Sequence, residues 1–127
     1  MSAQTVLSGG DKWYSYSGVV SGDVSVPASI QLVFLPNTGL RDSLVSIQPY
    51  YGRENNDSGG NVLGIEVKID DVTVIKQQSS VTGVYSMRNT TDFNLFVPRQ
   101  SKFEVISLNT SGNNVQERGC TVLGYYL

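Results

Sequence analysis

The clearest pattern in the chain is the alternation of apolar and polar residues between positions 63 and 69. The odd positions are all apolar, and two of the even positions carry charges. A period of two is typical of a strand with one buried and one solvated face. Asp70 and Asp71 interrupt the run before apolar positions resume. The pattern predicts a β-hairpin over residues 63–78.

Shorter runs predict the remaining strands. Residues 30–35 are almost all apolar, which favours a strand buried on both faces in the centre of the core. Residues 44–48 alternate, and Pro49 is expected to end that strand. The last run alternates to the final residue, so we expect it to lie inside a sheet. Further strands are expected at 12–20, 23–27, 84–87, 93–97, 102–108 and 115–127.

The fold class follows from these runs. No segment of ten or more residues shows an apolar stripe with the 3.6-residue period of a helix, and turn residues recur at about the 8 to 12 residue spacing of sandwiches and barrels. We therefore predict an all-β protein with an antiparallel sandwich of about eight or nine strands. Residues 11–127 form one domain in this prediction. Residues 1–10 lack a periodic pattern and are expected to form an extended N-terminal arm.

Two stretches are expected to be turns or loops. Residues 35–39 read LPNTG, which matches a sortase sorting signal, but 88 residues follow Gly39, with no apolar segment and basic tail of the kind that such a signal requires. Pro, Asn and Gly instead favour a tight turn between two strands. The polar stretch 50–62 is expected to be a long exposed loop.

Composition narrows the function. The 127 residues suit a single domain, and the only cysteine cannot form an internal disulfide. No signal peptide or membrane-length apolar run is present, so we expect synthesis in a cytoplasm and no membrane partner. The net charge of -2 lacks the basic excess that accompanies nucleic-acid binding. We therefore expect no nucleic-acid partner.

Candidate catalytic and metal-binding residues are few. Residues 56–60, NDSGG, resemble the nucleophile motif of trypsin-like proteases, but the chain has no histidine to activate Ser58 or to pair with Cys120. Zinc lacks its usual ligands, and we expect Cys120 to be a small buried side chain. Residues 55–57, and Asp70 with Asp71, could supply oxygen ligands to calcium, and the sequence leaves this alternative open. Carboxylate pairs meet only in three dimensions, so spacing does not test them. We expect no enzyme and no cofactor.

Aromatic residues cluster in two short stretches. They could form a platform for stacking sugars, or they could belong to the core or to a subunit interface. The sequence leaves these alternatives open. The residues of this possible aromatic contact patch are Trp13, Tyr14, Tyr16, Tyr50 and Tyr51.

The last quarter of the chain carries a resemblance to a known group of proteins. It combines a proline-led strand, an Asn/Ser/Gly hairpin and a final strand of the form V-x-L-x-G-Y-x-L. The residues that carry the likeness are Pro98, Phe103, Val105, Asn109, Gly112, Val122, Leu123, Gly124 and Tyr125. In these features the chain resembles the small jelly-roll capsid decoration proteins, or cement proteins, of tailed bacteriophages.

This resemblance implies a jelly-roll sandwich and a non-enzymatic, structural viral protein of the virion. The expected partners are a major capsid protein and the chain itself, as a homotrimer, after synthesis in the host cytoplasm. The alternative is a carbohydrate-binding or host-attachment module, such as a tail component or lectin-like domain. Because the arm cannot form an element alone, we expect it to contact the capsid or a neighbouring subunit. The expected contact residues are Ser2, Ala3, Gln4, Thr5, Val6 and Leu7.

Overall fold

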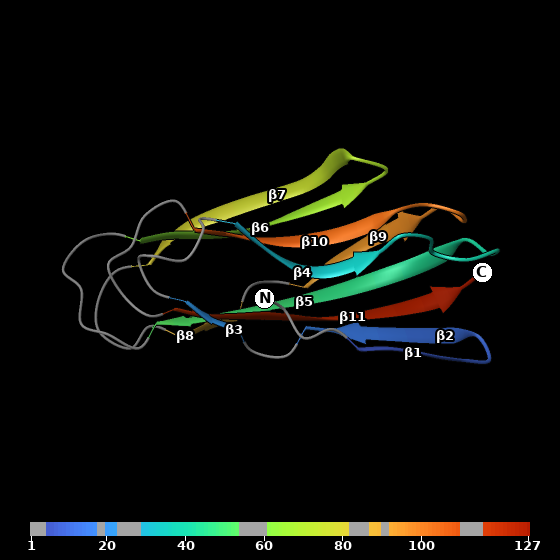
Figure 1. The fold of residues 1–127 in the computed structure, drawn as a ribbon, viewed down its shortest axis with the longest axis horizontal. Helices are drawn as coiled ribbons and strands as arrows, with labels where there is room; N and C mark the ends of the chain where they lie inside the picture. Colours follow the sequence, from blue (N-terminus) through green and yellow to red (C-terminus); the bar gives the residue numbers. More distant parts are fainter. Residues whose placement is uncertain are drawn as a thin grey trace.

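The described part of the protein consists of β-strands joined by turns and loops (Figure 1). The computed structural model describes residues 5–17, 20–22, 29–53, 61–81, 87–89, 92–109 and 116–127. The strands within these ranges are β1 (Thr5–Gly9), β2 (Lys12–Tyr16), β3 (Val20–Gly22), β4 (Ser29–Leu35), β5 (Ser43–Arg53), β6 (Asn61–Ile69), β7 (Val72–Val81), β8 (Met87–Asn89), β9 (Phe93–Val97), β10 (Phe103–Asn109) and β11 (Gln116–Tyr126). The predicted all-β class is confirmed.

The strands form two antiparallel sheets that lie one above the other in Figure 1. The larger sheet has the order β1-β2-β11-β5-β8, with β3 also paired to β11 and β9 to β5. The smaller sheet has the order β4-β10-β6-β7. Without β1, β3 and β8, the orders become β2-β11-β5-β9 and β4-β10-β6-β7, and the chain crosses repeatedly between the sheets. This is the jelly-roll arrangement. These eight strands agree with the predicted eight or nine, and β1, β3 and β8 are short additions to the larger sheet. The strand expected at 23–27 lies outside the described residues, as does most of the one expected at 84–87.

The hairpin predicted from alternation is confirmed. β6 and β7 pair in antiparallel register and are joined by Asp70 and Asp71, with φ angles of 50° and 67°. Two successive positive φ angles define the type I′ turn that suits the twist of a two-residue hairpin. The Asp70 carboxylate also accepts a hydrogen bond from the backbone N–H of Lys102 at 2.8 Å, which ties the turn to the start of β10.

The apolar run of β4 contributes Ile30, Leu32 and Val33 to the core, as predicted, but the expected burial on both faces is wrong. β4 lies at the edge of the smaller sheet and pairs only with β10 among the described strands. The register shifts between Val105 and Ile106, so that Leu32 has no partner opposite it. This bulge lets the adjacent residues Leu32 and Val33 both be buried. A bulge, rather than burial on both faces, explains the continuous apolar sequence.

The strand expected to end at Pro49 continues to Arg53. β11 pairs with β5 along its full length, including the register pair Cys120 and Pro49. On its other edge β5 pairs with β9 up to Ile47 and with β8 from Tyr50. Pro49 thus falls between these two described partners, at a place where its missing N–H costs no ladder bond on that edge. The expected loop at 50–62 is therefore shorter, and residues 54–60 lie outside the described ranges.

The N-terminal arm also differs from the prediction. Residues 5–9 form β1, which pairs with β2 and extends the larger sheet, while residues 1–4 lie outside the described ranges. The turn between β1 and β2 contains Gly10 at φ 59°. An edge strand is held by backbone hydrogen bonds to a single neighbour, so it can form without a strong apolar pattern.

The core lies between the sheets and includes Trp13. The Trp13 ring packs edge to face on Phe103 with 6.2 Å between centroids, and its Nε1 donates a hydrogen bond to Ser43 Oγ at 3.2 Å. Gly124 on β11 leaves room for this ring, because a Cβ at that position would overlap the indole. β11 lies between β2 and β5, which confirms the expectation that the last strand is inside a sheet.

The LPNTG stretch is the corner where the chain passes from β4 in the smaller sheet to β5 in the larger one. Asn37 Oδ1 accepts a hydrogen bond from the N–H of Gly39, whose φ is 100°. Thr38 is buried; its hydroxyl donates to the Pro98 carbonyl at 2.9 Å and accepts from the Ser101 N–H at 3.1 Å. The predicted turn is confirmed, and its threonine serves to join two loops.

Candidate functional site

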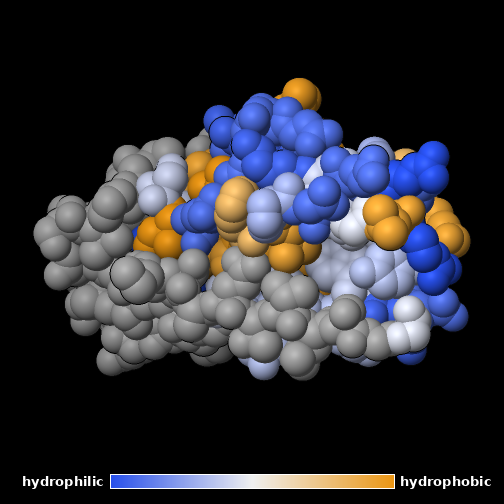
Figure 2. All heavy atoms as spheres, turned by 45° about the vertical axis from the view of Figure 1, so that its right-hand side comes forward, coloured by the Kyte–Doolittle hydropathy of each residue, from blue (hydrophilic) through white to orange (hydrophobic). Residues whose placement is uncertain are grey.

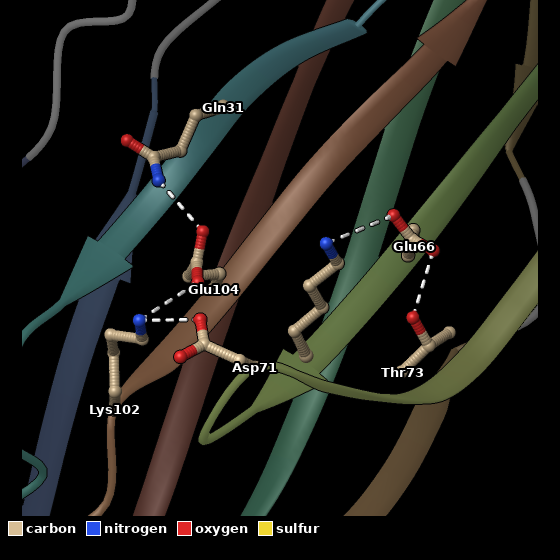
Figure 3. A network of polar contacts seen from close by, with 7 residues as sticks. Gln31, Glu66, Asp71, Thr73, Lys102 and Glu104 are labelled. Carbon is tan, nitrogen blue, oxygen red and sulfur yellow. Dashed lines mark hydrogen bonds and ion pairs between the residues drawn. The ribbon is translucent and has the colours of Figure 1, made fainter.

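The outer face of the smaller sheet carries a network of charged and polar side chains (Figure 3). Gln31 on β4 donates a hydrogen bond to Glu104 on β10 at 2.9 Å, and the Thr73 hydroxyl donates to Glu66 at 2.9 Å. Lys102 pairs with Asp71 and lies 4.0 Å from Glu104. The hydrogen bond with Asp71 is the main reason that the pKa of Lys102 is raised. These side chains therefore engage one another across β4, β10, β6 and β7.

The space-filling view agrees with this description. Hydrophilic side chains gather over the upper part of the molecule, where β6 and β7 lie in Figure 1 (Figure 2). Two apolar side chains of β7, Val72 and Val74, are also exposed. Val74 is the extra residue of a bulge in β7. Val67 pairs with Ile75 and Lys68 pairs with Thr73, so Val74 has no register partner on β6. A bulge and charged neighbours on an edge strand discourage pairing with other chains.

The outer face of the larger sheet is different, because apolar and aromatic side chains from four neighbouring strands lie together on it. Strand register places Lys12 opposite Tyr125, Tyr125 opposite Leu44, and Leu44 opposite Phe96. The next row runs from Tyr14 through Leu123 and Ser46 to Asn94. The exposed members and their exposed fractions are Tyr14 41%, Tyr16 42%, Leu44 50%, Phe96 50% and Tyr125 42%. We call this surface the aromatic face.

A groove of about 440 Å³ opens on the aromatic face. Its walls come from β5, β9 and β11, and they are mostly apolar. The lining residues are Leu44, Val45, Ser46, Asn94, Leu95, Phe96 and Tyr125. Lys12 lies over the Tyr125 ring at 5.4 Å from its centroid, a cation–π contact at the border of the groove. The surface can therefore accept an apolar or aromatic group.

The structure divides the aromatic residues predicted as a contact patch. Tyr14 and Tyr16 are exposed on the aromatic face, and Tyr50 is half-buried. Trp13 is only 3% exposed, so its assignment to a surface patch is wrong. The reason is strand geometry: Trp13 lies between two outward positions of β2, so it points into the core. The side chain of Tyr51 lies outside the described residues.

Sequence reasoning missed the residues at the centre of the aromatic face. They lie on three strands that the sequence predicted, but their place on an outer face was not predicted. The residues are Leu44, Phe96, Leu123 and Tyr125. Their signal was present, since each is apolar or aromatic at an outward position of an alternating run. Because single exposed apolar residues are common, such positions become informative only when register brings them together.

The predicted contact residues of the arm are only partly described. Ser2, Ala3 and Gln4 lie outside the described ranges. Thr5, Val6 and Leu7 belong to β1, at register positions opposite Tyr16, Ser15 and Tyr14. Their backbone therefore borders the aromatic face. Their contact with a capsid or a neighbouring subunit stays a prediction.

Two buried groups can be excluded as reactive centres. Cys120 is free and buried, as predicted, and burial raises the pKa of its thiol to about 12. A neutral, covered thiol is a poor nucleophile. Arg118 is 1% exposed, burial lowers its pKa, and its Nε and Nη1 have no hydrogen-bond partner among the described residues. Burial of these groups without a partner is costly.

The structure offers little support for metal binding. Among the described residues, no group of three or more Cys, Asp and Glu side chains comes together. Asp70 and Asp71 are engaged with Lys102 instead, and positions 55–57 lie outside the described ranges. Ser58 of the NDSGG stretch lies outside them too. The described part also contains no helix long and apolar enough to cross a membrane.

Comparisons with known proteins identify the fold but not a family. No protein-family model matches this sequence, and neither does any curated protein. Dimeric latent PorU from Porphyromonas gingivalis is similar in structure, with a TM-score of 0.55 and 8% identity over 95% of this chain and 13% of that one. A structure of infectious bursal disease virus, Gx strain, has a TM-score of 0.52 and 14% identity over 91% of this chain and 32% of that one. This chain spans a third or less of either relative. At these identities the likeness concerns the β-sandwich fold alone.

Proposed function

We propose that this chain is a structural protein of a virus particle, and specifically a decoration or cement protein that binds a phage capsid as an oligomer. The observation that carries the proposal is the aromatic face. Exposed aromatic and aliphatic side chains that are contiguous across several strands are typical of a surface that another protein covers. Its mechanism is the burial of apolar area between subunits and against the shell, which stabilises the assembled particle.

The fold supports this proposal without deciding it. Jelly rolls are common in viral capsid proteins and also in lectins. A virus structure is among the similar folds. The resemblance of the last quarter of the chain to phage decoration proteins supports the capsid as partner and a homotrimer as the assembly. The virion is accordingly the proposed location.

Co-sedimentation with undecorated capsids tests the proposal. Phe96→Asp introduces a charge into the groove without touching the core, and it is expected to reduce the amount that pellets with shells. Val74→Asp is the matched control, since Val74 is similarly exposed at 46% but lies on the smaller sheet. Equal pelleting of both variants, or no pelleting of the unmodified protein, would contradict the proposal.

The predicted arm contact belongs to the same proposal and needs its own variant. Because residues 5–9 pair with β2, their deletion would remove an edge strand. A deletion of residues 2–4 leaves β1 in place. We expect this deletion to weaken capsid binding while the melting temperature stays unchanged. Undiminished occupancy on shells would remove residues 2–4 from the contact.

The alternative function is carbohydrate binding or host attachment. It is favoured by Phe96 and Tyr125 in a groove that also contains the polar side chains of Ser46 and Asn94. Aromatic rings beside hydrogen-bonding groups can hold a sugar ring. Glycan-array binding that disappears in Phe96→Ala and persists in Val74→Ala would support this alternative. Silence across the array would count against it.

A further inference from the structure

The aromatic face is an apolar surface that the described part of the molecule leaves open. We propose that this face pairs with the same face of a second copy of the chain. The inference deepens the proposed function. It rests on one part of that function, namely that the aromatic face is covered in the assembled protein. It names the partner of that face as an identical chain, which would be present before any contact with a shell.

The positions on the aromatic face form a nearly square grid. One edge is the row Lys12, Tyr125, Leu44 and Phe96, and the opposite edge is the row Tyr16, Thr121, Gln48 and Asp92. Three strand spacings of about 4.8 Å and four residues of about 3.4 Å both measure about 14 Å. Lys12 and Asp92 therefore occupy diagonally opposite corners, and Tyr16 and Phe96 occupy the other two.

This placement of charge makes the face complementary to itself. A two-fold axis in the plane of contact, along the diagonal from Tyr16 to Phe96, places Lys12 of each copy against Asp92 of the other. Two ion pairs form at once, because residues of a two-fold interface meet reciprocally. The same axis crosses the strands of the two copies at nearly a right angle, which is one of the two ways in which sheets pack.

The apolar content and the extent of the face fit such a pair. Leu44 and Leu123 lie between the charged corners, and Tyr125 lies beside Lys12, so pairing would remove all three side chains from water. The strands of the larger sheet hold about 43 residues, each covering about 16 Å² of the sheet plane, which gives about 700 Å². A standard stable interface buries about 800 Å² on each partner. The larger sheet, of which the aromatic face is the central part, is thus close to the required size.

The two charged residues of the grid lie at its border and not in its apolar centre. Lys12 is exposed and supported by the Tyr125 ring, and Asp92 is exposed and accepts a hydrogen bond from Gln48 at 3.2 Å. Both are available for a partner at the border of the interface. Charges in such positions determine orientation and specificity more than affinity. They therefore provide a test that is independent of the apolar contact.

The first test is the mass of the unmodified protein by sedimentation equilibrium over a wide concentration range, without capsids. We expect two copies, or six copies where the proposed homotrimer also pairs through this face. A monomer at every concentration, or exactly three copies with no larger species, would overturn the inference. Capsid pelleting by a monomer would overturn the pairing and the oligomeric part of the proposed function, and would leave capsid decoration standing. A dimer that stays in the supernatant would support the pairing and overturn the capsid role.

The second test exchanges the two corner charges. Lys12→Asp and Asp92→Lys each create two like-charge contacts, so each is expected to raise the dissociation constant of the dimer by about tenfold. The double variant Lys12→Asp with Asp92→Lys restores opposite charges and should restore the dimer. Failure of the double variant to recover would overturn the diagonal arrangement. Circular dichroism of each variant checks that the fold is retained.

The third test addresses the apolar centre. Leu44→Glu buries a charge in the pair and is expected to abolish dimers, whereas Val74→Glu on the smaller sheet should leave the mass unchanged. Both residues are exposed in the single chain, so neither change should prevent folding. Dimers that survive Leu44→Glu, or that are lost equally with Val74→Glu, would overturn the proposed surface.

Discussion

The outer faces of the two sheets differ although both sheets cover the same core. On the smaller sheet, Glu66, Lys102 and Glu104 engage their neighbours in a solvated network, and the apolar residues Phe34 and Ile106 are half-buried. On the larger sheet, Leu44 and Phe96 are half exposed and register places them side by side. The difference indicates which side of the sandwich faces water and which side is suited to another protein.

The largest expected effect is a difference in stability between substitutions on the inner and the outer side of the larger sheet. Gly124→Ala forces a methyl group into the Trp13 ring and should lower the free energy of unfolding by about 3 kcal/mol. Tyr125→Ala, the next residue along β11 and on the aromatic face, should lower it by less than about 1 kcal/mol in the monomer. Denaturant unfolding of both variants measures this contrast. Equal losses would mean that Tyr125 is part of the folded core.

Thiol reactivity gives a sharper contrast between the two sides of β11. Cys120 points inward and Thr121 outward. Native protein should therefore react slowly with a thiol reagent at pH 8, because the buried thiol stays neutral. A Thr121→Cys variant made together with Cys120→Ala should react like a free thiol and be slowed when the protein assembles. Fast labelling of Cys120 in the native protein would contradict its burial.

The same thiol predicts a dependence of stability on alkaline pH. In the unfolded chain Cys120 ionises near its ordinary pKa of 9.0, while burial raises its pKa in the folded state to about 12. Its contribution is therefore complete below pH 9 and is lost as the pH rises from 9 toward 12. The free energy of unfolding of Cys120→Ala should fall less steeply over this range. Parallel curves for the two proteins would contradict the shift.

The smallest effect is expected on the outer face of the smaller sheet. Thr73→Val removes the hydrogen bond to Glu66 while keeping the shape of the side chain. Because the Glu66 carboxylate keeps Lys68 Nζ at 4.0 Å, the expected loss in the free energy of unfolding is about 0.5 kcal/mol. Assembly and capsid binding should be unchanged. Impaired assembly in Thr73→Val would indicate that the polar face also makes contacts.

Much of the fold could be predicted from alternation. The β6–β7 hairpin, the inward positions of β9 and the final strand follow from residues that repeat with a period of two, because one face of each strand is buried. The edge position of β4 and the continuation of β5 past Pro49 could not be predicted. Both depend on which strands become neighbours, and local sequence does not specify that.

The candidate site was predictable only in part. Tyr14 and Tyr16, which the sequence indicated as possible contact residues, are exposed. Trp13 was wrongly grouped with them, because neighbouring residues of a strand point to opposite faces of the sheet and this alternation was not applied. Leu44, Phe96 and Tyr125 come from three separate strands, and only register brings them into one row. A surface assembled from strands far apart in the sequence requires the topology, which this chain's local patterns do not contain.

Hydroxyl-radical footprinting of the assembled protein tests the central claim most directly, since it reports the solvent exposure of individual side chains. Compared with the isolated chain, the assembly should protect Tyr14, Phe96 and Tyr125, while the oxidation of Val72 and Val74 on β7 stays the same. Protection of the β7 residues with unchanged labelling of Phe96 and Tyr125 would show that the smaller sheet makes the contact, and would contradict the account.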